Sequence, residues 1–165
     1  MGYVRVALVA LAASVVTACA QHAPPGDAAE IRAIEERIYA PYLDQDLETG
    51  DAAIEDAAPW SNATRARIAE ADRLVESTVF VFNPLTGSQE DIISNLRVGE
   101  PRLNADGTAV VEIHFFFGSE RVQRHQFIRE EGAWRLNNIR SDDWELDTLL
   151  QAAMDEDREN RARSR

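Results

Sequence analysis

The stretch 109-AVVEIHFFFGSERVQRHQFIREEGAWRLNNI-139 decides the fold. Apolar and polar side chains alternate along 109–117, 122–128 and 134–139, with the period of two that is typical of β-strands. Gly118-Ser119-Glu120 and Glu131-Gly132 separate these runs and have the composition of hairpin turns. The sequence therefore predicts three consecutive antiparallel strands.

Shorter patterns on both sides of this meander predict the remaining elements. Runs of apolar residues at 79–82 and 96–98 indicate two more strands. Helical spacing predicts helices over about 27–43 and 64–76, and a third helix that Ser141 or Asp142 caps and whose apolar stripe is Leu146, Leu149, Leu150 and Ala153. Helices before and after a meander indicate an α+β fold, with helices packed on one face of a curved antiparallel sheet.

Composition excludes several classes of chemistry. The chain has 165 residues, of which 45% are hydrophobic and 28% charged, as expected for one globular domain. All seventeen basic residues are arginine, so side-chain Schiff bases are excluded. The single cysteine excludes disulfide frameworks and zinc sites built from cysteine, and three histidines limit any metal site to one rich in carboxylates. We expect no cofactor.

The N-terminus reads as an export signal. Residues 1–18 combine Arg5, an apolar run from Val6 to Val16 and small residues, and this run is too short to span a bilayer. The tetrapeptide Val16-Thr17-Ala18-Cys19 resembles the bacterial lipobox. The resemblance implies cleavage after residue 18, a lipid on Cys19 as the membrane anchor and, with Ala20 in the next position, the outer membrane facing the periplasm.

The mature chain divides into three parts. Residues 19–26 would form a tether containing Pro24-Pro25-Gly26, 27–154 a single α+β domain, and 155–165 a charged, solvated tail. Without the signal peptide, sixteen arginines stand against 29 acidic residues, a side-chain charge of −13. This charge argues against nucleic acid as a partner and against a face that lies on anionic lipid.

Three segments resemble a bacterial family of domains of unknown function, number 3828. Phe82-Asn83-Pro84-Leu85 followed by Gln89-Glu90-Asp91-Ile92 resembles one signature of the family, and 131–139 resembles its Gly-Gly-Trp-Arg strand. Tyr39 to Leu43 is similar to its first helix. The resemblance implies a nuclear transport factor 2-like, or cystatin-like, cone, and it carries no settled activity.

One loop resembles a calcium site. Residues 44–55 place acidic and amide oxygens at spacings near those of an EF-hand loop. Thr49 holds the position at which the sharp turn needs glycine, and Pro59 leaves little room for an exit helix. The alternative is a solvated acidic loop, and we assign no metal ligand.

The strand pair around Gly118 carries the candidate ligand-binding residues Glu112, His114, Arg124 and His125. Glu112 and His114 share a face because strand side chains alternate. A two-residue turn would place His114 opposite His125, a pair that could bind a divalent metal or move protons, whereas a three-residue turn would place His114 opposite Arg124. The alternative to both is an ordinary solvated outer face.

Aromatic residues at this hairpin suggest a contact surface. Three consecutive phenylalanines must point to both faces, so we expect Phe116 to be exposed and to contact a partner, and we expect Trp134 in the core.

These patterns favour a periplasm-facing lipoprotein that is a non-enzymatic binding module for a protein or a small ligand. The alternative is an isomerase or dehydratase that uses the interior of the cone, drawing on Tyr39, Tyr42, His114 or Asp142. No catalytic residue is assigned. The enzyme needs convergent ionisable groups in an enclosed pocket, and the binding module needs an exposed apolar patch or a pocket without such groups.

Overall fold

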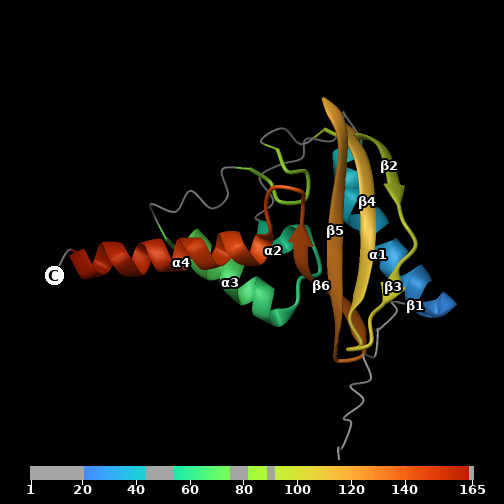
Figure 1. Cartoon of the computed structure of the whole chain (residues 1–165), viewed down its shortest axis with the longest axis horizontal. Helices are drawn as coiled ribbons and strands as arrows, with labels where there is room; N and C mark the ends of the chain where they lie inside the picture. Colours follow the sequence, from blue (N-terminus) through green and yellow to red (C-terminus); the bar gives the residue numbers. More distant parts are fainter. Residues whose placement is uncertain (1–20, 44–53, 75–81, 89–91, 164–165) are drawn as a thin grey trace, which may run out of the picture.

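The computed structural model describes residues 21–43, 54–74, 82–88 and 92–163 (Figure 1). Its strands are β1 (Gln21–His22), β2 (Ser94–Val98), β3 (Arg102–Leu103), β4 (Ala109–Phe117), β5 (Ser119–Glu130) and β6 (Ala133–Arg140). Its helices are α1 (Pro25–Leu43), α2 (Ile54–Ala57), α3 (Asn62–Asp72) and α4 (Leu146–Arg163).

The six strands form one antiparallel sheet in the order β1-β3-β4-β5-β6, with β2 also paired to β4. The sheet is open, and α1 lies along one face of it (Figure 1). Helices α3 and α4 contact each other and lie beside β6. The predicted α+β class and the predicted meander of β4, β5 and β6 are confirmed.

Residues with a positive φ form the two hairpin turns. Gly118, with a φ of 64°, is the one residue between the paired residues Phe117 and Ser119. Glu131 and Gly132 have φ values of 53° and 83°, and positive φ at both central positions is typical of the tight type I′ turn that matches the twist of paired strands. The second turn lies where the sequence predicts it, whereas the first is shorter than predicted, because Ser119 and Glu120 already belong to β5.

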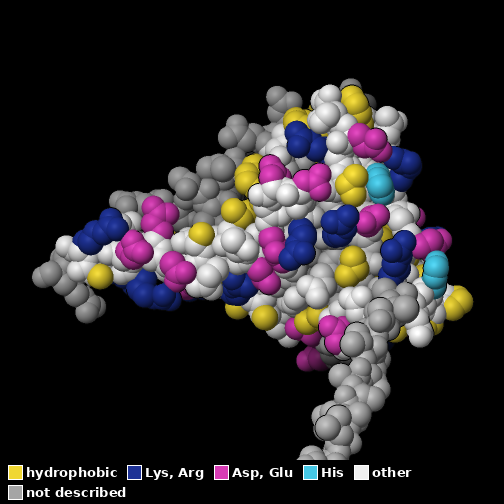
Figure 2. Space-filling model, in the orientation of Figure 1, with side chains coloured by type: hydrophobic (Ala, Val, Ile, Leu, Met, Phe, Trp, Pro, Cys, Tyr) yellow, Lys and Arg dark blue, Asp and Glu magenta, His cyan; other side chains and the backbone are white. Residues whose placement is uncertain are grey.

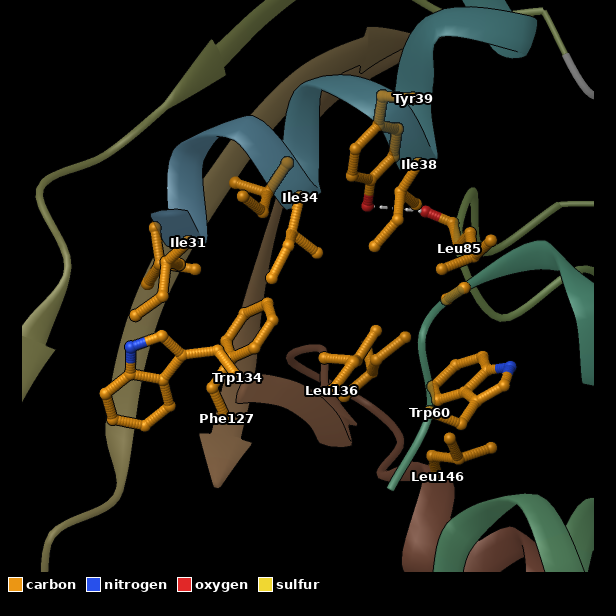
Figure 3. Close-up of a cluster of buried hydrophobic side chains, with 14 of the residues drawn as sticks. Ile31, Ile34, Ile38, Tyr39, Trp60, Leu85, Phe127, Trp134, Leu136 and Leu146 are labelled. Carbon is orange, nitrogen blue, oxygen red and sulfur yellow. Dashed lines mark hydrogen bonds between the residues drawn. The ribbon is translucent and has the colours of Figure 1, made fainter. Parts of the chain in front are cut away.

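Alternation along β4 separates an inner face from an outer face. Its odd-numbered residues from Ala109 to Phe115 are buried, whereas Phe116 is 45% exposed. Apolar residues of α1 pack against the inner face, as Figure 3 shows for Ile31, Ile34 and Ile38 above Trp134 and Phe127. The predictions for Trp134 and for the exposure of Phe116 are confirmed.

The core continues from the sheet into α3 and α4. Ser61 caps α3, since its side chain accepts a hydrogen bond from the Thr64 amide, and Ile68 and Ala71 of α3 are buried. Leu146 and Leu150 of α4 are buried beside them. The third predicted helix therefore exists, although it begins at Leu146 and not directly after Ser141 or Asp142.

Two segment boundaries differ from the prediction. The charged stretch predicted as a tail from residue 155 is helical through Arg163, because ion pairs Arg161–Asp157 and Arg163–Glu159 lie one turn apart along α4. The predicted tether is folded from Gln21 onwards, since β1 pairs with β3 and α1 already begins at Pro25.

Some predictions fall on other parts of the chain. The export signal, most of the EF-hand-like loop (44–53) and most of the predicted strand 79–82 lie outside the described residues. None of the helices within the described ranges combines the length and the apolar character needed to cross a bilayer.

Candidate functional site

Four polar side chains meet between α1 and the inner face of β5. Glu35 and Tyr39 lie one turn apart on α1, and Gln123 and His125 alternate along β5, so each pair points to the same side of its element. Glu35, Tyr39 and His125 are 0% exposed and Gln123 is 2% exposed. We call these four residues the inner network.

His125 is at the centre of the inner network. Its Nδ1 lies 2.9 Å from Glu35 Oε1. Its Nε2 lies 3.1 Å from Gln123 Oε1 and 3.3 Å from Tyr39 Oη. The imidazole is therefore held at both nitrogens by groups from two different elements.

The loop 82–88 covers the inner network through two backbone carbonyls. Tyr39 Oη donates to Leu85 O at 2.9 Å, the bond drawn in Figure 3, and Gln123 Nε2 donates to Pro84 O at 3.3 Å. Asn83 shapes this loop, because its Oδ1 accepts from the Leu85 amide at 2.9 Å and its carbonyl accepts from the Gly87 amide at 2.7 Å. Gly87 has a φ of 65°, which favours glycine in this tight turn.

The hydrogen bonds of the inner network fix the orientation of the Gln123 amide. A carbonyl only accepts, so the bond to Pro84 O turns the Gln123 amide with Nε2 toward the loop and Oε1 toward His125. Both nitrogens of His125 then face acceptor oxygens, one on Gln123 and one on the Glu35 carboxylate. His125 therefore contacts Glu35 through Nδ1 and both Gln123 and Tyr39 through Nε2.

Tyr39 remains protonated in this environment. Burial raises the pKa of Tyr39 well above the ordinary tyrosine value, and the charge of Glu35 and then Tyr42 raise it further. The hydroxyl is consequently a donor, and the carbonyl of Leu85 accepts its hydrogen bond.

The inner network has the groups of a proton-transfer site but is closed. Glu35 Oε2 is buried without a hydrogen-bond partner, so one carboxylate oxygen is unused. Three surface cavities whose linings fall within the described residues include none of the four side chains. Among the described residues, the loop 82–88 covers the inner network, so its displacement would be one way to bring a substrate to His125.

Glu112, His114 and Arg124 lie on the outer face instead. Arg124 pairs with Glu112 across the strands, and its Nε donates to Glu112 Oε1 at 3.0 Å. His114 Nε2 is 3.9 Å from Glu112 Oε2. The prediction that Glu112 and His114 share a face is confirmed, and this face carries salt-bridged, partly exposed side chains.

Both predicted registers of this hairpin were wrong. His114 pairs with Val122, and His125 pairs with Val111, because strand pairing continues to Phe117 and Ser119 and Gly118 alone makes the turn. The two histidines consequently lie on opposite faces and cannot share a metal ion. In the parts of the chain that the structure describes, no cluster of three His, Cys, Asp or Glu side chains could hold a metal.

Sequence reasoning missed Glu35 and Gln123. Of the four residues proposed for the interior, Tyr39 reaches the inner network and Tyr42 lies on the same face of α1, whereas His114 and Asp142 do not. The signal was present as two periodicities. Glu35 lies on the apolar stripe of α1 at helical spacing, and Gln123 lies two residues before His125, on the same face of β5. A charged side chain on a buried stripe requires a partner inside the protein.

A second candidate site is an apolar surface. Leu43, Ile92 and Phe116 are the exposed large hydrophobic residues of the described chain, at 44%, 49% and 45% exposure. Ser94 pairs with Phe116, and the Ile93 amide donates to Tyr42 O, so the three lie at the same end of the sheet. We call Leu43, Ile92 and Phe116 the apolar corner.

Comparison with known proteins gives no relative for this chain: no family model, no curated protein and no solved structure matches it.

Proposed function

We propose that this protein is a periplasm-facing lipoprotein, held at the outer membrane by a lipid on Cys19, and that its domain is a non-enzymatic interaction module. The apolar corner is the observation that carries the proposal. Leu43, Ile92 and Phe116 are all exposed at one end of the sheet, and large apolar side chains left exposed in one region favour contact with another protein.

The position of the apolar corner suits a protein anchored at its N-terminus. β1 begins two residues after Cys19 and pairs with β3, which in turn pairs with Ala109 and Val110 at the start of β4. Phe116 lies six residues further along β4, or about 20 Å at the usual rise of a strand. A lipid at Cys19 would therefore leave the apolar corner at the far end of the sheet from the membrane.

The closed interior supports a binding role over catalysis. The space between α1 and the sheet is occupied by packed apolar side chains and by the inner network. This filling distinguishes the domain from an open cone that receives a substrate. The nuclear transport factor 2-like architecture and the relation to family 3828 belong to the same proposal, which the α+β layout and the antiparallel sheet support.

Photo-crosslinking in intact cells tests the interaction module. A photoreactive phenylalanine analogue would replace Phe116 or, as the control, Ile128, which lies on the outer face toward the other end of β5. We expect a protein adduct from position 116 and none from 128. Equal yields from both positions, or none from 116, would contradict the proposal.

The anchor needs its own test. Mass spectrometry of the mature protein should show a lipid-modified Cys19 at the N-terminus, and Cys19→Ala should abolish both the modification and membrane partition. A Cys19→Ala protein that still partitions with membranes would contradict the lipoprotein assignment, whatever the crosslinking shows.

The inner network favours a second candidate function, an isomerase or dehydratase acting on a small carbonyl compound. The specific observation is the Glu35–His125 pair with Tyr39 as a nearby donor. Such an enzyme would exchange solvent deuterium into the carbon next to the carbonyl of an added ketone or enone. Exchange that His125→Asn abolishes and His114→Asn leaves unchanged would favour this function, and no exchange above buffer would reject it.

A further inference from the structure

The outer face of the sheet contains a cavity that neither the inner network nor the apolar corner uses. It has a volume of about 210 Å³ and lies between β4, β5, β6 and the segment that leads into α4. Figure 2, in the orientation of Figure 1, shows arginine and acidic side chains interleaved over these strands. The cavity is lined by Val110, Arg124, Gln126, Asn138, Arg140 and Glu145.

Strand pairing builds the cavity in two rows. Arg124 faces Arg140 across β5 and β6, and Gln126 faces Asn138 in the next row. Val110 of β4 pairs with Gln126 and supplies an apolar wall. Two guanidinium groups directly opposite each other repel, so the arrangement is stable only if negative groups lie nearby.

Two glutamates supply that charge, one on each side. Arg124 donates through Nε to Glu112 Oε1 at 3.0 Å, and Arg140 donates through Nη2 to Glu145 Oε2 at 2.7 Å. Glu145 Oε1 in turn accepts from Asn138 Nδ2 at 2.7 Å. Each oxygen of Glu145 therefore already accepts one hydrogen bond, one from Arg140 and one from Asn138.

Most N–H groups of the two arginines remain available. A guanidinium has five N–H donors, and each arginine uses one of its nitrogens on its glutamate. Within the described residues, the side-chain amide of Gln126 forms no hydrogen bond. The cavity thus offers an excess of donors, which is the complement of a ligand that only accepts.

We propose that this cavity binds a carboxylate, held between Arg124 and Arg140 with Gln126 as an additional donor and Val110 against the attached carbon chain. Planar guanidinium groups match the two oxygens of a carboxylate. A water molecule occupies roughly 30 Å³ of the liquid, so the cavity has room for a carboxylate and a short chain. Acidic residues far from the cavity oppose an anion only weakly, because salt screens charges beyond about 8 Å. The two nearest carboxylates, Glu112 and Glu145, are each paired with an arginine of the cavity.

Such a carboxylate has two sources, a free organic acid or the C-terminus of a peptide. The probes are acetate, N-acetyl-trialanine as the free acid, and the same peptide with an amidated C-terminus. Side-chain N–H resonances of Arg124 and Arg140 report binding in the full mature domain. We expect both acids to shift these resonances saturably and the amide to leave them unchanged.

Variants separate the cavity from general charge. Arg140→Gln and Arg124→Gln should each weaken binding of the peptide acid at least tenfold, and Gln126→Leu should weaken it less. Arg135→Gln, which removes an arginine of β6 that does not line the cavity, is the matched control and should change nothing. Retained circular dichroism spectra would show that each variant is folded.

The relative affinities of the peptide acid, acetate and the peptide amide distinguish the two sources of the carboxylate. Tighter binding of the peptide acid than of acetate assigns the site to peptide C-termini, and equal binding assigns it to small organic acids. Absence of saturable shifts with either acid, equal binding of the amide, or equal weakening by Arg135→Gln would each overturn the proposal. None of these results depends on the apolar corner, so the proposed function is tested separately.

Discussion

Arg124 and His125 are neighbours in the sequence, yet they belong to two different chemical environments. His125 points inward, is fully buried and is hydrogen-bonded at both nitrogens, whereas Arg124 points outward, is half-exposed and contacts one glutamate. The same comparison holds for two glutamates: Glu35 is buried beside His125, whereas Glu112 pairs with Arg124 at the surface. An ion pair that water does not reach is much harder to break than one that water can replace.

Glu35→Gln should produce the largest effect. The substitution leaves the buried His125 without a counter-charge, and breaking one side of a buried pair costs about 3 kcal/mol or more. Urea unfolding followed by tryptophan fluorescence measures the loss, since Trp134 and Trp60 are buried in the same core. A loss below about 1 kcal/mol would contradict a stabilising contact between Glu35 and His125.

Gln123→Leu should rank second. It leaves Pro84 O and His125 Nε2 without one hydrogen-bond partner each, and unsatisfied buried groups cost about 1 to 3 kcal/mol. Hydrogen exchange at the Leu85 amide should also accelerate, because the loop 82–88 loses the hydrogen bond from Gln123 to Pro84 O. The matched control is Gln126→Leu, the same substitution three residues later on the outer face, which should stay within about 0.5 kcal/mol.

Alkaline pH should reveal the buried environment of Tyr39. Because burial raises the pKa of Tyr39 in the folded state, the unfolded chain loses this proton first as the pH rises past about 10. Stability should therefore be unaffected below that pH and fall above it, and Tyr39→Phe should flatten this fall. An unchanged slope in the Tyr39→Phe variant would contradict the closed environment.

Glu112→Gln should have the smallest effect. The Arg124–Glu112 pair is about half exposed on both sides, and exposed ion pairs contribute roughly 0 to 1 kcal/mol and weaken with salt. The same urea titration at low and high salt measures it. A loss as large as that of Glu35→Gln would erase the difference between the two faces.

The sequence was sufficient for the long strands β4, β5 and β6 and for the positions of the main helices, but not for the short strands β1 and β3 or for how the elements meet. Alternation through β4, β5 and β6 and the glycines at 118 and 132 predicted the hairpins, because these signals are local. Register depends on how many residues lie in the turn, and the positive φ at Gly118 allowed a one-residue turn where the predictions assumed two or three residues. That difference separated His114 from His125.

Contacts between residues far apart in the sequence could not be predicted from local patterns. Glu35 and His125 are 90 residues apart, and no spacing rule connects a helix stripe to a strand in another part of the chain. The charged C-terminal stretch was misassigned for a different reason. Its composition suggested a solvated tail, but acids and arginines three or four residues apart also support an exposed helix.

Reaction of the three histidines with diethyl pyrocarbonate, followed by peptide mass spectrometry, tests the closed interior most directly. His22 is exposed, His114 is partly exposed and His125 is fully buried. We predict rapid modification of His22, slower modification of His114 and none of His125 until the protein unfolds. Modification of His125 in the folded protein at the rate of His114 would show an interior open to small molecules and would contradict the account.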